Sequence, residues 1–232
     1  MIKHRKFALA ALTAAALGLS GSAFAAAVIA KDNTNMSNIP GLTGFSTTGA
    51  MMSGLAITAN FATFSQTLLW ATTGPNSGGV TGNGWGLSLD GDTFSALWNF
   101  TFDAGNHPGE ILSLVIDGTN ALTVLDTDNP SPGTPGSAAG NDFTFSNPNL
   151  HAIATYTNEV SILAAQPVGD LYQTLTVVFT NDHGSARPRD NFTFLQDTDN
   201  DSRFRVPEPG SLALLGLGLI GVAALRRRAR AA

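Results

Sequence analysis

Residues 93–103 read TFSALWNFTFD, and hydrophobic and polar side chains alternate along most of this stretch. One face of the expected strand carries Phe94, Ala96, Trp98, Phe100 and Phe102, and the other is polar except for Leu97. A period of two is typical of a β-strand with one face in a hydrophobic core and the other toward solvent. The stretch therefore predicts a half-buried strand that contributes Trp98 to a core.

The same pattern recurs along the chain. Residues 170–180, DLYQTLTVVFT, place Leu171, Leu175, Val177 and Phe179 on one face. Further short strands are expected at 54–59, 61–71, 85–90, 110–117, 121–126, 142–146, 151–157, 160–164 and 191–196. Many short strands separated by turns predict an all-β fold, an antiparallel β-sandwich or jelly roll.

Two segments do not follow the alternation. Residues 32–50 are rich in Asn, Gly, Ser and Thr and indicate loops or a short edge strand. Residues 126–141, DTDNPSPGTPGSAAGN, break any regular element and form either a loop within one domain or a hinge between halves. One domain is the preferred interpretation, because each half alone would contain few strands.

The charge distribution restricts the partners of this chain. Its 232 residues carry a net charge of −5, but seven of the twelve basic residues lie at the two ends. Between residues 26 and 205 there are five basic and sixteen acidic residues, a net charge of −11. Such a body does not favour nucleic acid, which is bound through clustered Lys and Arg. The absence of Cys excludes a disulfide framework and thiolate chemistry.

The N-terminal residues 1–25 have the three parts of a secretory signal peptide. Lys3, Arg5 and Lys6 precede an uncharged apolar run from Phe7 to Leu19. Ala23 and Ala25 provide the small-residue pattern for cleavage after Ala25. This predicts passage through the Sec translocase and removal by signal peptidase. The alternative is an N-terminal membrane anchor that is retained.

The C-terminal residues 206–232 have a comparable three-part organisation. Pro207, Glu208 and Pro209 form a rigid, extended start, because proline fixes its own φ and restricts the preceding residue. Ser211 to Leu225 is uncharged, and Arg226, Arg227, Arg228 and Arg230 follow. As a helix the apolar stretch is slightly short of the ~30 Å hydrocarbon core, and the arginines would stay cytoplasmic. We expect a short transmembrane helix that anchors the chain in the inner membrane.

This order of Pro-Glu-Pro, apolar stretch and arginine cluster resembles the PEP-CTERM sorting signal. The resemblance implies an exported protein of an exopolysaccharide-producing Gram-negative bacterium. It also implies that an exosortase, a membrane cysteine peptidase, recognises the motif through residues such as Pro207, Glu208 and Pro209, and removes the tail. A permanent C-terminal anchor is the alternative. The chain would then consist of a signal peptide (1–25), a β-sandwich ectodomain (26–205) and a sorting signal (206–232).

A cation site is the first candidate in the body. Asp197, Asp199 and Asp201 alternate along DTDND, and loop carboxylates at this spacing can surround Ca²⁺, which takes six to eight oxygen ligands. Glu208 completes an EF-hand-like spacing, but Ser202 replaces the required glycine and no helices flank the loop. The alternative is a solvated acidic turn paired with Arg203 and Arg205.

A sugar-binding aromatic residue is the second candidate. Trp85 lies in Gly82-Asn83-Gly84-Trp85-Gly86, where glycines allow a ligand to approach the backbone, but a place in the core is the alternative. Catalysis has little support, because no histidines have metal-ligand spacing and no Gly-x-Ser-x-Gly elbow is present.

These observations predict an exported surface or extracellular-matrix protein without enzymatic activity. It would be held briefly in the inner membrane and then serve as a structural or adhesive component associated with exopolysaccharide. A carbohydrate- or Ca²⁺-binding module and an extracellular hydrolase are the two alternatives. No other cofactor is expected.

Overall fold

The computed structural model describes residues 27–33, 36–43, 46–128, 133–134, 137, 140–181 and 186–203. The expected signal peptide and C-terminal transmembrane helix lie outside these ranges. Among the described residues, none forms a helix with the length and hydrophobicity required to cross a bilayer.

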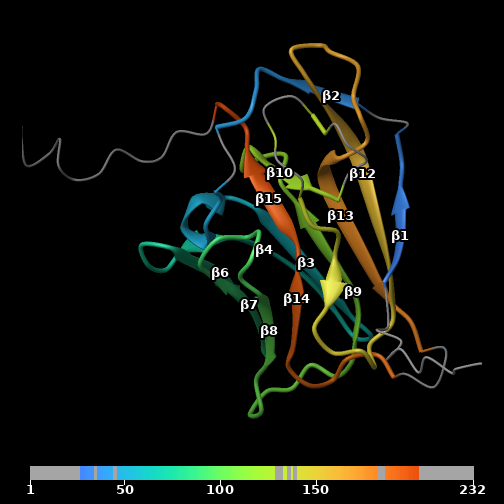
Figure 1. Cartoon of the computed structure of the whole chain (residues 1–232). Coiled ribbons are helices and arrows are strands. Elements are labelled where there is room, and N and C mark those ends of the chain that lie inside the picture. Colours follow the sequence, from blue (N-terminus) through green and yellow to red (C-terminus); the bar gives the residue numbers. More distant parts are fainter. Residues whose placement is uncertain are drawn as a thin grey trace, which may run out of the picture.

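Fifteen strands and one 3₁₀ turn make up the described chain (Figure 1). They are β1 (Val28–Lys31), β2 (Met36–Ile39), η1 (Gly49–Met52), β3 (Ala56–Phe61), β4 (Ser65–Leu69), β5 (Ala71–Thr72), β6 (Ser77–Thr81), β7 (Trp85–Asp90), β8 (Trp98–Phe102), β9 (Ile111–Asp117), β10 (Thr123–Asp126), β11 (Thr144–Phe145), β12 (Ala152–Ile162), β13 (Leu171–Phe179), β14 (Phe192–Leu195) and β15 (Asp197–Asn200).

The strands form two sheets. The nine-stranded sheet has the order β1-β12-β13-β9-β3-β4, with β2 also on β12, β10 on β13 and β15 on β10. The six-stranded sheet has the order β11-β14-β8-β7-β6-β5. Pairing is antiparallel except for β1 and β2, which both run parallel to β12. The prediction of a mostly β fold is confirmed at this level.

One hydrophobic core joins the two sheets, because each contributes one face of alternating apolar side chains. Leu175 and Val177 of β13 and Ile116 of β9 are fully buried from the larger sheet. The smaller sheet contributes an aromatic stack in which the rings of Trp98 and Phe194 lie 5.7 Å apart at an interplanar angle of 13°. Burial of such rings is the largest hydrophobic contribution per residue.

The stretch 93–103 is only partly the strand that its pattern predicts. The strand begins at Trp98, whereas residues 93–96 form a turn in which Asp92 Oδ1 accepts a hydrogen bond from the Phe94 N–H at 3.0 Å. Trp98 and Phe100 are buried as expected, but Phe94 is 49% exposed and lies outside the core. The local capping contact by Asp92 overrides the alternation at this end.

Two other segments differ from the expectation. The two strands expected at 151–157 and 160–164 form the single strand β12, with the positive φ of 60° at Asn158 as a local irregularity. Residues 197–200 form strand β15 instead of a turn. Within residues 32–50, the short strand that was one of the two expectations is β2, which pairs with β12.

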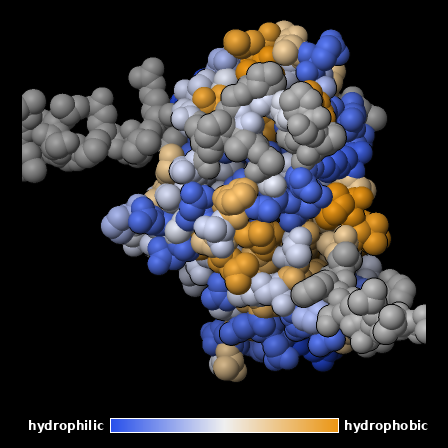
Figure 2. All heavy atoms as spheres, viewed as in Figure 1, coloured by the Kyte–Doolittle hydropathy of each residue, from blue (hydrophilic) through white to orange (hydrophobic). Residues whose placement is uncertain are grey.

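The outer face of the larger sheet is nearly free of charge. Its central row consists of Ala30, Thr155, Thr176, Val115, Thr58 and Thr67, which are paired in register across six strands. A neighbouring row begins with the exposed Val28, Ile153 and Val178. Figure 2 shows hydrophobic residues at the surface on the side where β1 and β12 lie.

Figure 1 shows the described chain ends far apart. The chain enters β1 at the lower right of the view and leaves after β15 at the upper left. The segments that precede β12 and β14 lie at the lower end, opposite the exit of the chain. This separation determines which surfaces are distant from the C-terminal segment.

Candidate functional site: a buried carboxylate cluster and a polar groove

The three predicted cation ligands lie on or next to β15. This strand pairs with β10, with Asp126 opposite Asp197 and Val124 opposite Asp199. Asp197, Asp199 and Asp201 are 4%, 1% and 1% exposed, respectively. The strand pairing therefore buries carboxylates that the sequence pattern had placed in a loop.

The three carboxylates have different partners. Asp197 Oδ1 accepts hydrogen bonds from Thr93 Oγ1 and from the Thr198 N–H, both at 2.8 Å. Asp201 forms an ion pair with Arg203 and accepts its backbone N–H at 2.8 Å. In the part of the chain that the structure describes, no group of three or more His, Cys, Asp or Glu residues could hold a metal ion. The predicted set therefore does not converge on a cation position.

Asp199 instead forms a bridged pair with Asp126. Ser137 Oγ lies 3.0 Å from Asp126 Oδ2 and 2.9 Å from Asp199 Oδ2. A serine hydroxyl has one proton and can donate it to one carboxylate only. Both carboxylates share this one donor, and the negative charge of Asp199 favours a proton on Asp126.

Burial is the main reason that this proton is retained. Together with the charge of Asp199, burial raises the pKa of Asp126 from 3.8 to about 8. Burial likewise raises the pKa of Asp199 to about 7 and that of Asp197 to about 6. Among the described residues, Asp126 Oδ1 has no hydrogen-bond partner, so nothing offsets the burial of that oxygen.

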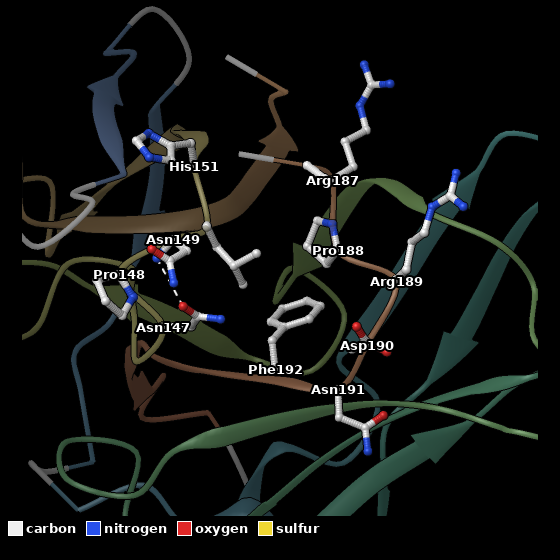
Figure 3. A pocket seen from close by; sticks show the side chains of 12 residues that line it. Asn147, Pro148, Asn149, His151, Arg187, Pro188, Arg189, Asp190, Asn191 and Phe192 are labelled. Carbon is white, nitrogen blue, oxygen red and sulfur yellow. Dashed lines mark hydrogen bonds between the residues drawn. The ribbon is translucent and has the colours of Figure 1, made fainter. Parts of the chain in front are cut away.

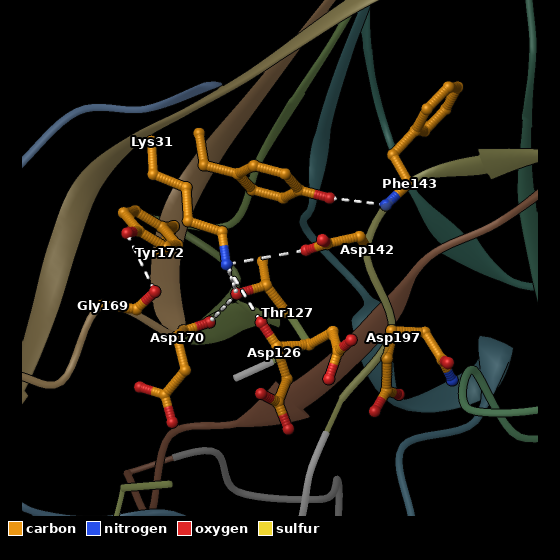
Figure 4. Close-up of polar contacts among 12 residues, drawn as sticks. Lys31, Asp126, Thr127, Asp142, Phe143, Gly169, Asp170, Tyr172 and Asp197 are labelled. Atoms are coloured by element: carbon orange, nitrogen blue, oxygen red, sulfur yellow. Dashed lines mark hydrogen bonds and ion pairs between the residues drawn. The ribbon is translucent and has the colours of Figure 1, made fainter. Parts of the chain in front are cut away.

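Figure 4 shows the basic residue Lys31 near Asp126 and Asp170, but its amino group contacts other residues. Its Nζ donates to Thr127 Oγ1 at 2.9 Å and to the Asp128 carbonyl at 3.0 Å, and it lies 3.7 Å from Asp142 Oδ1. It thus fastens β1 to the segment after β10. Asp170, further along the cluster, accepts the Thr134 N–H at 2.8 Å.

Trp85 is not the exposed aromatic residue that its glycine-rich surroundings suggested. It is 2% exposed and stacks on Phe100 with ring centroids 5.6 Å apart and an interplanar angle of 7°. Its Nε1 donates to Gln66 Oε1 at 2.9 Å. A side chain on residue 82 would begin 2.3 Å from that nitrogen, so Gly82 allows the turn to cover the indole. The ring therefore has no free face on which a sugar could stack.

A cavity of about 450 Å³ lies between two loop segments, residues 147–151 and 186–192 (Figure 3). No pattern in the sequence predicted this site. Its lining is rich in Asn and Pro and includes His151 and Phe192. An adjoining hollow of about 300 Å³ is lined by Asn99, Ser146, Asn147, Asn191, Phe192 and Thr193. We call the two together the amide groove.

Signals for the amide groove were present but weak. Asn147-Pro148-Asn149 and Pro188 mark turns, which is all that their residue types indicate. Only the folded chain brings the two segments together, through the pairing of β11 with β14.

The described residues define the class of the body, a two-sheet β fold. Residues 205–228 match the model of the PEP-CTERM protein-sorting motif, so the chain carries this motif at its C-terminus. The motif implies export, sorting by an exosortase and a cell-surface location. No curated protein and no solved structure matches the chain.

The matched range contains Pro207, Glu208, Pro209 and Arg226 to Arg228, the residues assigned to recognition. Like Ala23 and Ala25 of the signal peptide, they lie outside the described residues. Their individual roles stay predictions.

Proposed function

We propose that this protein is a non-enzymatic structural or adhesive component of the cell surface or extracellular matrix, associated with exopolysaccharide. The observation that carries the proposal is the sorting motif at residues 205–228. The signal peptide exports the chain, the apolar C-terminal stretch holds it transiently in the inner membrane, and the exosortase then acts at the Pro-Glu-Pro segment.

The body supports a role without catalysis. Its two glutamates, Glu110 and Glu159, are ion-paired and buried, respectively. Glu110 lies 3.7 Å from both Arg187 and Arg189, and Glu159 is 2% exposed. An acid–base pair for glycoside hydrolysis needs two carboxyl groups across an accessible bond. We expect no turnover of a panel of polysaccharides, and turnover lost on replacing one carboxylate would overturn this part of the proposal.

The sorting step is tested by intact mass measurements on separated fractions of the native host. The wild-type product should start near Ala26, end near the Pro-Glu-Pro segment and lie outside the inner membrane. Glu208→Ala should leave a product with its arginine tail in the inner membrane. Ser202→Ala, an exposed position before the matched range, is the control and should sort normally.

Association with exopolysaccharide is tested separately. In a host strain that cannot make the polysaccharide, the processed protein should move from the matrix fraction into the medium. The same distribution in both strains would contradict the association while leaving the sorting step intact.

A further inference from the structure

The amide groove is an extended depression and not a closed pocket for one small molecule. Its two hollows, of about 450 and about 300 Å³, share Asn147, Asn191 and Phe192. A ligand that fills both must pass over the start of β14. This shape fits a segment of a linear chain.

The polar groups of the groove are side-chain amides and hydroxyls. Asn147 Oδ1 accepts the Asn149 N–H at 3.0 Å, and Asn191 Oδ1 accepts the Phe102 N–H at 2.7 Å. These bonds fix the orientation of both amides, and no described residue accepts from their NH₂ groups. Asn99, on the adjoining strand β8, is exposed. Amides both donate and accept, which matches hydroxyl groups, since these also do both.

The lining also contains apolar groups. Figure 3 shows Phe192 between the two loop segments, with Pro188 beside it and Pro148 on the opposite segment. Phe192 is 5% exposed and Pro188 is buried, so they form a floor, whereas the exposed Pro148 can offer aliphatic carbon to the C–H face of a sugar ring. Polar groups at the edge would fix the orientation of the ligand. Sugar rings, which have hydroxyl groups at the edge and apolar faces, fit both the amide groups and the apolar carbons of this lining.

The charges around the groove balance. Arg187 and Arg189 each lie 3.7 Å from Glu110, and Asp190 adds a second negative charge. Figure 3 shows both arginine side chains extending away from Phe192. With a net charge of −11 on residues 26–205, the body as a whole repels polyanions. The groove therefore favours an uncharged ligand.

We propose that the amide groove binds a neutral polysaccharide chain through Asn99, Asn147 and Asn191. This inference rests on the proposed function and names the ligand class for it. The groove lies at the end of the molecule opposite the exit of the chain toward the sorting motif. A body held through its C-terminus thus presents the groove away from the attachment point.

Affinity electrophoresis of the full chain in native gels tests the inference. The gels contain a neutral polymer (dextran, galactomannan or hydroxyethyl cellulose) or the polyanion alginate. We expect retardation by at least one neutral polymer and none by alginate. Asn99→Ala should reduce the retardation several-fold, because this exposed side chain forms no hydrogen bond with a described residue and its removal leaves the fold intact.

Ser88→Ala is the matched control. Ser88 lies on β7 and is the register partner of Asn99, but it lines neither hollow. Asn147→Ala, checked for an unchanged melting temperature, is a second variant with the same expected loss. Retardation by alginate alone, by no polymer, or equally for the Asn99→Ala and Ser88→Ala variants overturns the assignment. Such a failure leaves the sorting and matrix experiments untouched, so the two proposals are separable.

Discussion

The pair formed by Asp126 and Asp199 should make the folded protein less stable as the pH rises. Burial and the charge of Asp199 raise the pKa of Asp126 from 3.8 to about 8. Between these two pH values the unfolded chain has released the proton that the folded chain retains. The free energy of unfolding therefore falls by about 1.36 kcal/mol for each pH unit. Below pH 3.8 the ionisation of Asp126 does not affect stability, and above about pH 8 its destabilising effect is complete.

The magnitude follows from the interval that is measured. Between pH 5 and pH 8 the contribution of Asp126 is about 4 kcal/mol, a large fraction of a typical total of ~5–15 kcal/mol. Asp199 and Asp197, with pKa values raised to about 7 and about 6, act in the same direction. Asp126→Asn is neutral at every pH and removes the first contribution. Between pH 5 and pH 8 the unfolding free energy of the variant should therefore fall by about 4 kcal/mol less than that of the wild type.

Urea unfolding followed by tryptophan fluorescence measures this difference. Trp70, Trp85 and Trp98 are all buried and report on loss of the core. Asp90→Asn, an exposed aspartate at the end of β7, is the control and should follow the wild-type pH profile. A wild type that is as stable at pH 8 as at pH 5, or an Asp126→Asn profile parallel to it, would refute the reasoning.

Three further substitutions test packing and fastening. Lys31→Met should lower the unfolding free energy by ~1–3 kcal/mol, because it removes two hydrogen bonds from a charged donor. Gly78→Ala should destabilise by more than ~3 kcal/mol in urea titrations, since the new Cβ would lie 2.1 Å from Trp70 Nε1. Phe100→Ala should cost about 3–5 kcal/mol through the cavity it leaves in the aromatic stack, measured in the same way.

The glycine and phenylalanine substitutions each have a control in the chain. Gly105→Ala meets only Asp103 Oδ1 at 3.5 Å and should be tolerated. Phe94→Ser replaces a side chain that is 49% exposed and should change stability by less than ~0.5 kcal/mol. If Gly78→Ala destabilised the protein no more than Gly105→Ala, or Phe100→Ala no more than Phe94→Ser, the described burial would be contradicted. For Lys31→Met, unchanged stability would show that β1 is held by its strand pairing alone.

The strands with strict alternation could be predicted from the sequence. Residues 85–90 form β7 with the expected bounds, and β13 differs from its expected range by one residue at each end. Here every second side chain faces the core, so local pattern and tertiary environment agree. At Phe94 they disagree, because the turn stabilised by Asp92 takes the first residues out of the strand.

The carboxylate cluster could not be predicted in this form. DTDN has no hydrophobic pattern and suggests a loop, yet β10 pairs with it and buries all four residues. The hydrogen-bond donors that stabilise these buried carboxylates are distant in sequence. Thr93 lies 104 residues from Asp197, and Ser137 lies 62 residues from Asp199. Trp85 shows the same limit, since Gln66 and Phe100 decide its burial. The spacing of the Asp residues pointed to this part of the chain, but not to their burial in a strand.

The position of β15 has a consequence for maturation. Its residues are buried, Asp201 bridges to Leu42, and the Ser202 N–H donates to the Gly41 carbonyl at 2.7 Å. The body is thus fastened up to the residue before Arg203, and the matched motif starts at residue 205. Strand β15 thus ends before the matched range, and we expect that processing within that range need not unfold it.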